Sequence, residues 1–474
     1  SGVTVVFRPP IRQGPSMRVA VSLEDVKKEV DTGKGDRPCY WKAENHVDET
    51  SNLRVENWLK PIRHLVLAHD DASLSSTIRI THDQGTAILR YIEEVKMFAN
   101  IRDTKIKAQN NGQMPEGHPE EGWKDPLFLD HHWETEVLKN WPSSKNRSKW
   151  LKSLKELESE LETAITKAKG NSETSAAFVK LSVRSPKDAV FNQKRYYEIL
   201  EKRLSERKIN SVDEKSLSIR VEAIRYASWK ALKCYTAKQA MDLLLRSERI
   251  YVDILQHELF TKGDKDRKFN LNAHVAPFKE TFDPSLEFRG FVAGGKRTAI
   301  TAYSPFVYDE KIVKEKKKIW EKIDEIWTQA EAKLTLKDYS IDFCLSPDLK
   351  ECRIIEINAF LPPLAGCGLF DYDNEKDRKL MLEGVGEFEF RIKSSPLTID
   401  DFTKERTDHK TGKVTKMVMM PAPPHVMFLI DGIQKSKEGA RPWGPSSALW
   451  ENGSGTGGFN LEVIEKEQST CAVC

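Results

Sequence analysis

Three side chains with oxygen ligands, Asp342, Glu356 and Asn358, stand inside two short apolar runs of the chain. The runs flank a polar segment at 346–350, and this pattern predicts a β-hairpin over residues 339–360. Because side chains alternate between the two faces of a strand, the three oxygen ligands can converge. A buried carboxylate is costly unless its charge is compensated, and Mg²⁺ prefers oxygen ligands. The hairpin therefore predicts a magnesium site.

The same hairpin allows other interpretations. By strict alternation Asp342 shares its face with Ser340, while Glu356 and Asn358 share theirs with Ile354. That face could instead be exposed to solvent, or its acids could be bonded to neighbouring side chains. In a metal site the fold should tolerate Asp342→Asn, whereas in a bonded network the same change should destabilise it.

Two cationic residues also lie inside predicted strands. Lys180 shares a face of the apolar run 176–183 with Phe178 and Ser182. Its charge needs an anionic partner, unless the run is an edge strand on which Lys180 only hinders pairing with a further strand. Arg289 lies in a second predicted hairpin at 286–300, with its tight turn at 293–296. Two cations and three oxygen ligands are what a triphosphate with Mg²⁺ requires. Because the chain has neither a phosphate loop nor a G-x-G-x-x-G fingerprint, a nucleotide site built on β-strands is predicted.

Helical periodicity places these strands within a larger fold. It predicts helices over 86–101, 148–169, 221–245 and 375–383, and a long helix with a buried stripe between 312 and 330. Gly170 marks the end of the second of these. Residues 83–85 are predicted to form a turn, and the segment 246–256 is predicted to run on into a strand.

The composition is that of an ordinary globular protein. The 474 residues exceed what one core usually absorbs, and 39% are hydrophobic and 31% charged. With 75 basic and 72 acidic residues the net charge is +3, so no nucleic-acid partner is expected. No membrane-spanning run or secretory segment is visible, and seven scattered cysteines favour reduced thiols. We therefore expect a cytoplasmic protein.

Two further groups of residues could carry chemistry. The cluster of Asp130, His131, His132, Glu134 and Glu136 suggests a metal site, but adjacent histidines point differently on any regular element, so a surface or packing role is favoured. The last four residues, from Cys471 to Cys474, fit a C-a-a-X prenylation signal, although Cys is not a usual final residue. A membrane is expected as a partner only if Cys471 is prenylated. The Gly/Ser-rich stretch 452–458 predicts a flexible tail.

The ordered set of segments resembles the ATP-grasp fold and, within it, the cell division cycle protein 123 family. The segments that carry the resemblance are FVKL at 178–181, SPKDA at 185–189, LLLRSERIYVD at 243–253, EFRGFV at 287–292, YSIDF at 339–343 and IEINAF at 355–360. The resemblance implies an α/β fold with its nucleotide site between β-sheets. It divides the chain into an unmatched N-terminal region at 1–147, possibly a substrate or partner domain, an ATP-grasp core at 148–395 and a C-terminal extension at 396–474.

The resemblance also implies roles for single residues. Lys180, with Ser182 and Lys187, would bind the ATP phosphates, and Arg289 would lie over the γ-phosphate, so that Lys180 and Arg289 would be catalytic. Mg²⁺ would be coordinated by Asp342, Glu356 and Asn358. The chain departs from the family where Ser182-Val183 replaces Asn-Trp and where EINAF replaces DFNPF, and the family's N-terminal Trp-Tyr-Pro segment has no counterpart.

Two functions follow from this site. We expect an ATP- and Mg²⁺-dependent ligase that phosphorylates a carboxylate and joins it to an amine, because the charged set is complete while the N-terminal family segment is missing. Its partners would be ATP and the carboxylate and amine substrates, bound near residues 361–370 or the N-terminal region. The alternative, implied by the resemblance, is an ATP-binding assembly chaperone whose protein client is eukaryotic translation initiation factor two, through its gamma subunit.

Overall fold

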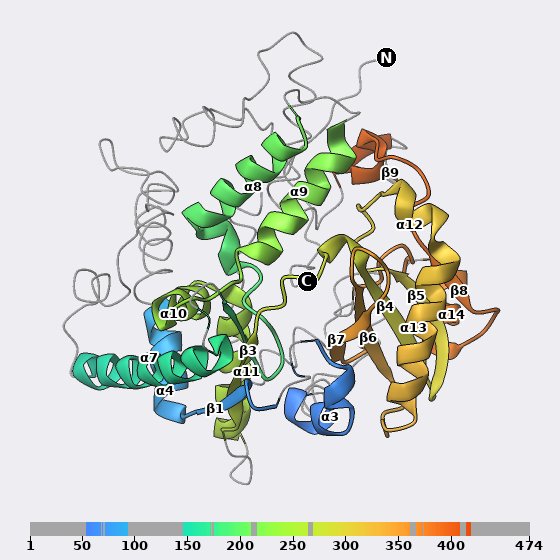
Figure 1. The fold of residues 1–474 in the computed structure, drawn as a ribbon. Coiled ribbons are helices and arrows are strands. Elements are labelled where there is room, and N and C mark those ends of the chain that lie inside the picture. The colour runs from blue at the N-terminus through green and yellow to red at the C-terminus, as the bar shows by residue number, and fades with distance from the viewer. Residues whose placement is uncertain are drawn as a thin grey trace. The chain divides into compact units, whose positions relative to one another are not determined.

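Helices and strands are interspersed along the described part of the chain, and the computed structural model arranges these residues as a mixed α/β fold with three sheets (Figure 1). It describes residues 54–67, 69, 72–92, 146–170, 172, 175–209, 216–263, 269–360, 366–372, 374–407 and 414–418. The α/β class predicted from the sequence is confirmed.

The chain forms two compact units, each made of separate segments. The first, called here the three-stranded unit, contains the described residues within 52–199 and 227–281. The second, the five-stranded unit, contains those within 200–226 and 282–418. The chain passes between the units inside α8 (Lys194–Glu206) and inside α9 (Leu217–Lys230). Each unit therefore combines residues from more than one of the three consecutive parts expected from the sequence, 1–147, 148–395 and 396–474.

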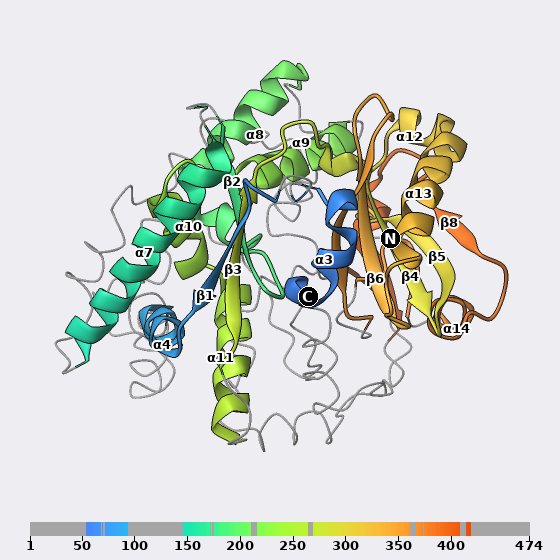
Figure 2. The ribbon, with the colours of Figure 1, turned by 60° about the horizontal axis from the view of Figure 1, so that its bottom comes forward.

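The three-stranded unit is built on an antiparallel sheet in the order β1-β3-β2. Its strands are β1 (Ser76–Ile80), β2 (Ala177–Leu181) and β3 (Leu271–Pro277). The strand predicted at 176–183 is thus confirmed as β2. One face of the sheet is apolar and packs against α7 (Arg147–Lys169). Figure 2 shows α7 on one side of this sheet and α3 (Val55–Ile62) on the other.

Two helices of this unit show how local signals fix their ends. The predicted helix at 148–169 is confirmed as α7, and Gly170 ends it with a φ of +60°. The helix α4 (His82–Tyr91) begins at Thr81, whose hydroxyl accepts from the Gln84 amide while the Gln84 side chain accepts from the Thr81 amide. The turn predicted at 83–85 is therefore wrong, because this capping box starts a helix there.

The region after Leu245 is helical, contrary to expectation. The helix α10 (Ala237–Leu245) is followed by α11 (Glu248–Gly263), so the strand predicted within 246–256 is wrong. The Ser247 hydroxyl accepts from the Ile250 amide at 3.1 Å and caps α11. The helix predicted over 221–245 is divided between α9 and α10, because Cys234 forms a bridge with Ala177 between them. Shorter elements here are η1 (Arg63–Leu65) and η4 (Ala189–Asn192).

The five-stranded unit contains a sheet in the order β7-β6-β4-β5-β8. Its strands are β4 (Glu287–Ala293), β5 (Lys296–Ala302), β6 (Tyr339–Leu345), β7 (Cys352–Asn358) and β8 (Glu389–Arg391). All neighbours are antiparallel except β5 and β8. Both predicted hairpins are confirmed, and Gly294 and Gly295 turn the first with φ of +59° and +75°. A separate sheet pairs β9 (Thr403–Thr407) with β10 (Val414–Val418).

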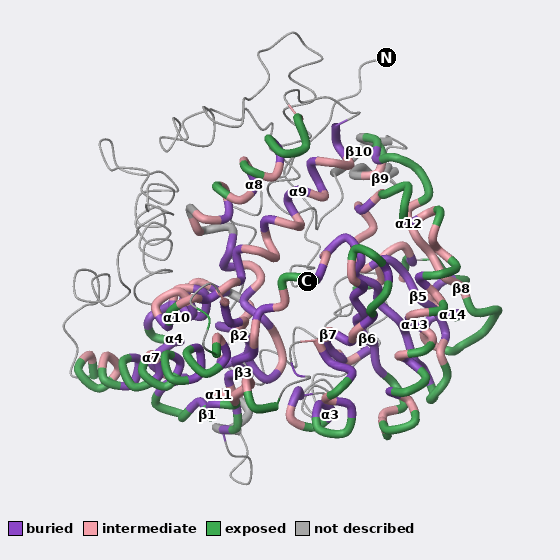
Figure 3. Tube along the Cα trace, in the orientation of Figure 1, coloured by how far each residue is buried: buried purple, intermediate pink, exposed green. Residues whose placement is uncertain are grey.

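Helices cover both faces of the five-stranded sheet. The long helix predicted between 312 and 330 is broken at Glu315 into α12 (Glu310–Lys314) and α13 (Lys316–Glu331). On one face Trp327 of α13 contacts Phe343, with 5.3 Å between ring centroids. On the other face α14 (Glu375–Glu383), at its predicted position, packs over β4 and β5. Figure 3 shows the central strands almost entirely buried. The 3₁₀ turns of this unit are η6 (Pro284–Leu286) and η7 (Ile399–Phe402).

Several sequence-based expectations fall outside the described residues. They are the continuation of α4 to residue 101, the cluster at 130–136, the segment 361–365, the flexible tail from 452 and the C-terminal cysteines. Within the described part of the chain, Cys234, Cys344, Cys352 and Cys367 form no disulfide bonds, and no helix has the length and apolarity needed to cross a bilayer.

Candidate functional site

A row of polar side chains crosses the five-stranded sheet on the face opposite α13. The strand registers place Glu356, Asp342, Arg289, Thr301 and Arg391 directly opposite one another, each on a different strand. Directly opposed residues on neighbouring strands are close and share a face of the sheet. The fold therefore brings three of the predicted site residues onto one line.

Arg289 and Asp342 pair with each other. Arg289 Nε donates to Asp342 Oδ1 at 2.7 Å, and Arg289 Nη2 donates to Oδ2 at 2.8 Å. Asp342 is fully buried and Arg289 is 8% exposed, so the interpretation of a solvated sheet face is wrong. Burial alone would lower the pKa of Arg289, but the adjacent Asp342 carboxylate outweighs burial and raises it. The guanidinium is therefore a fixed positive charge held by two hydrogen bonds.

Asn358, the third predicted magnesium ligand, also contacts Asp342. Its Nδ2 donates to Asp342 Oδ2 at 3.2 Å. A bulge at Ile355 interrupts β7, since Asp342 pairs with Glu356 whereas the next residue of β6 pairs with Ile354. The extra residue shifts the alternation, so Ile354 lies on the α13 side and not, as predicted, on the face of Glu356. Glu356 and Asn358 remain on the face of Asp342.

The three predicted ligands fit Mg²⁺ by their chemistry and in part by their arrangement. Two adjacent carboxylates and one amide oxygen are the hard ligands that this cation takes. Asp342, however, already accepts three hydrogen bonds from Arg289 and Asn358, which occupy most of its roughly four acceptor positions. Among the described residues, no three or more His, Cys, Asp or Glu side chains gather in the manner of a metal site. Magnesium binding at Asp342, Glu356 and Asn358 stays a prediction.

Two residues around Arg289 were not predicted from the sequence, the aromatic Tyr303 and the cationic Arg225, which contacts the Tyr303 ring. The Arg289 guanidinium lies 4.6 Å from the centre of the Tyr303 ring, and its Nη1 donates to the Gly366 carbonyl at 3.2 Å. Arg225 of α9 lies 5.6 Å from the same ring and pairs with Glu287 at 3.0 Å. A tyrosine after a strand and an arginine in a helix carry no signal of their own. Only the tertiary fold identifies them as part of the site.

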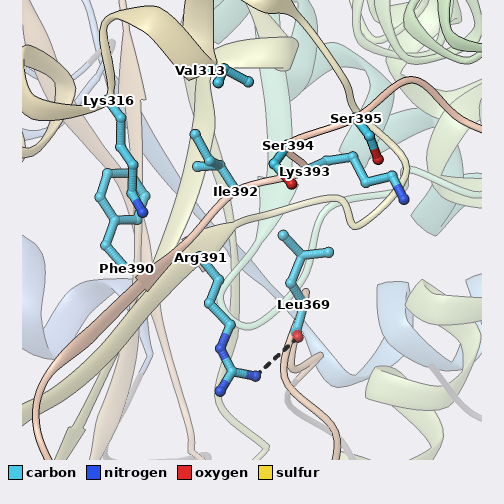
Figure 4. A pocket seen from close by; sticks show the side chains of 9 residues that line it. All are labelled: Val313, Lys316, Leu369, Phe390, Arg391, Ile392, Lys393, Ser394 and Ser395. Atoms are coloured by element: carbon cyan, nitrogen blue, oxygen red, sulfur yellow. Dashed lines mark hydrogen bonds between the residues drawn. The ribbon is translucent and has the colours of Figure 1, made fainter.

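An open pocket of about 460 Å³ lies at the β8 edge of the same sheet (Figure 4). Its lining residues are Val313, Lys316, Leu369, Phe390, Arg391, Ile392, Lys393, Ser394 and Ser395. Two of its three cations are held in ion pairs, Arg391 with Asp377 at 2.7 Å and Lys393 with Asp401. The third, Lys316, lies 5.1 Å from the centre of the Phe390 ring. None of the predicted site residues lines this pocket.

In the three-stranded unit, Lys180 and Ser182 lie on the sheet face away from α7. Lys180 of β2 is directly opposite His274 of β3, and the Ser182 amide donates to the Asn272 carbonyl at 2.9 Å. Lys180, Ser182 and His274 are all buried. The sheet therefore presents a cation and several hydrogen-bond donors on one face.

The Glu56 carboxylate of α3 contacts this polar face. Ser182 Oγ donates to Glu56 Oε1 at 2.5 Å, Asn272 Nδ2 donates to the same oxygen, and His274 Nε2 lies 3.2 Å from it. Burial raises the pKa of Glu56, but hydrogen bonds from His274, Asn272 and Ser182 outweigh burial and lower it to about 2. Ser182, predicted to bind nucleotide, thus contacts a carboxylate of the chain itself.

Lys187, the remaining predicted phosphate ligand, lies in the loop after β2. Asp188 in this loop accepts from Ser247 Oγ at 2.6 Å, and Arg184 Nε donates to Asp253 Oδ1 at 2.6 Å. Two of the segments that carry the family resemblance, 185–189 and 243–253, therefore contact each other. The beginning of α11 fixes the position of the Lys187 loop.

These contacts define a mixed α/β protein in which a sheet of each unit has a buried face that bears charged side chains. The D123 family model matches residues 223–419. Over these residues the resemblance to the cell division cycle protein 123 family is confirmed. The matched region contains Arg289, Asp342, Glu356 and Asn358 but begins after Lys180.

Two solved structures of Cdc123 from Schizosaccharomyces pombe are similar to the chain. The first has 16% sequence identity and a TM-score of 0.43, and the similarity covers 73% of this chain and 98% of that chain. The second, a C-terminally truncated form, has 16% identity and a TM-score of 0.44 with the same coverage. No curated protein matches the chain.

Proposed function

We propose that the protein is an ATP-binding assembly factor of the D123 family, built on an ATP-grasp framework, whose client is the gamma subunit of eukaryotic translation initiation factor two. The observation that carries the proposal is the family match over residues 223–419, which includes the strands that hold Arg289 and Asp342. The carboxylate–amine ligase expected from the sequence has no support from the comparisons.

The pairing of Arg289 with Asp342 favours a binding role over turnover. A ligase needs cations that meet the transferred phosphoryl group in the transition state. Here both ends of the Arg289 guanidinium fork are engaged by one buried carboxylate. Such a pair holds the sheet in one geometry and is suited to shaping a ligand-dependent surface.

In this proposal Lys180, Ser182 and Lys187 contact the ATP phosphates, and Arg289 lies near the γ-phosphate. Asp342, Glu356 and Asn358 would hold Mg²⁺, which when bound offsets the charge of the phosphates. The residues of the chain bind and orient the nucleotide.

The test is retention of the purified gamma subunit by the full chain, with and without ATP and Mg²⁺. We expect retention to increase with ATP, and Lys180→Ala to weaken ATP binding by about 10- to 100-fold, the loss of one charge-assisted hydrogen bond. Lys152→Ala is the matched control, because the Lys152 side chain is 78% exposed on α7. Release of ADP and phosphate that depends on added carboxylate and amine would overturn the assembly role and favour the ligase.

A further inference from the structure

We propose that Ser182, Asn272 and His274 form an oxyanion-binding site for a phosphate group, and that Glu56 occupies this site as an internal competitor until a ligand displaces its side chain. The identification of the ligand as a nucleotide phosphate rests on the proposed function. The oxyanion site and its competitor rest on the contacts of the three-stranded unit alone.

The donors converge on a single oxygen atom. Ser182 Oγ and Asn272 Nδ2 donate to Glu56 Oε1, and His274 Nε2 lies 3.2 Å from the same oxygen. His274 Nε2 and Glu56 Oε2 are both buried with their hydrogen-bonding capacity unsatisfied. A carboxylate has acceptor positions on both oxygens, and here the donors gather at Oε1 alone. Three donors around one point are what a single phosphate oxygen requires.

The neighbouring side chains suit an anion. Thr77 Oγ1 lies 3.2 Å from His274 Nδ1, and a hydroxyl can donate to that nitrogen, which leaves Nε2–H to face the site. Lys180 lies directly opposite His274 on the same face and supplies a positive charge. A phosphate carries more negative charge than the carboxylate that it would replace, so this face favours it.

Glu56 can leave the donors without dismantling the fold. Its side chain is 25% exposed, whereas Ser182 and His274 are 1% and 3% exposed. The helix that carries it is anchored by other residues, because Trp58, Leu59 and Ile62 are buried. A rotation of the Glu56 side chain toward solvent would therefore open the site while α3 stays in place.

The experiment compares pyrophosphate and Mg-ATP binding to the full chain by calorimetry, in the wild type, Glu56→Gln and Glu56→Ala. If the carboxylate occupies the donors about 90% of the time, removing its charge should tighten binding about tenfold. Glu156→Gln is the matched control, since it removes an exposed glutamate from α7 on the other side of the sheet. Ser182→Ala in the Glu56→Gln background should abolish the gain.

Each outcome separates the inference from the proposed function. Tighter pyrophosphate binding by Glu56→Gln without any ATP binding would support the oxyanion site and overturn the nucleotide function. ATP binding that is equal in the wild type, Glu56→Gln and Glu56→Ala would overturn the inference and leave the function standing. Absence of pyrophosphate binding in every variant would also overturn the inference, and Glu56 would then be a structural contact of α3.

Discussion

Asp342 has no exposed surface, and its two carboxylate oxygens accept hydrogen bonds from Nε and Nη2 of Arg289. Each buried charge is therefore compensated by the other. Asp342→Asn would leave a buried guanidinium without its counter-charge. We expect the free energy of unfolding to fall by about 3–5 kcal/mol. Chemical denaturation of the ligand-free protein measures this loss.

Glu321→Gln is the control for this substitution, because Glu321 lies on α13 with a side chain that is 61% exposed. A surface change of this kind should alter stability by no more than about 0.5 kcal/mol. If the Asp342→Asn variant instead keeps its stability and loses only Mg²⁺-supported ATP binding, the main role of Asp342 is to bind the metal, and its ion pair with Arg289 contributes little to stability.

Glu56 predicts a dependence of stability on pH. Its pKa is about 2 in the fold and 4.5 ordinarily, so its stabilising contribution is complete above about 4.5 and is lost as the pH falls toward 2. The wild type should therefore be more stable than Glu56→Gln at pH 6, and the difference should shrink below about pH 4.5. Urea midpoints of both proteins between pH 6 and pH 3 measure it. A difference that does not change with pH would contradict the assignment.

At the level of secondary-structure elements, β4 packs so closely against α13 that there is no space for a side chain at Gly290. A Cβ on Gly290 would lie 2.3 Å from Cη2 of Trp327, and Trp327 is fully buried. Gly290→Ala should therefore destabilise the protein by about 1–3 kcal/mol through overpacking. Thermal denaturation tests this, and Trp327→Phe in the same protein should recover part of the loss because the smaller ring makes room. Purely additive effects of the two substitutions would rule out this steric cause.

Elements defined by short-range patterns were predictable from the sequence. The alternation in β6 and the two glycines at the β4–β5 turn predict both hairpins, because these signals lie within a few residues of each other. The segment IYVDIL in α11 was not predictable in this way. Its β-branched residues favour a strand, but the Ser247 cap and burial in the three-stranded unit make it a helix.

The site was predictable as a set of residues but not as a set of contacts. Arg289 and Asp342 were both identified, yet their pairing depends on the register of strands whose partners are 53 positions apart. Glu56 was missed, because it meets Ser182 across 126 positions and no local pattern marks it. The bulge at Ile355 was missed for a similar reason, since its sequence is as regular as that of its neighbours.

At the scale of the whole molecule, the interleaved units determine which fragments can fold. A fragment of residues 148–474 would lack β1, which pairs along the whole of its length with β3. The freed edge of β3, with its buried Leu271, Ala273 and Val275, would favour aggregation. We expect this fragment to elute from a sizing column as large aggregates while the full chain elutes as a discrete species. A soluble fragment with a cooperative melt would instead support an independent core that begins at 148.

The same pairing of β1 with β3 also matters while the protein is being made. Ile80 pairs with Leu271, so about 190 further residues must be synthesised before the partner of β1 exists. At roughly 5–20 residues per second, the ribosome needs about 10–40 s for this stretch. Throughout that time Ile78 and Ile80, which the finished fold buries, have no sheet to join. We therefore expect the nascent chain to expose this apolar surface during synthesis, which favours aggregation unless the surface is protected.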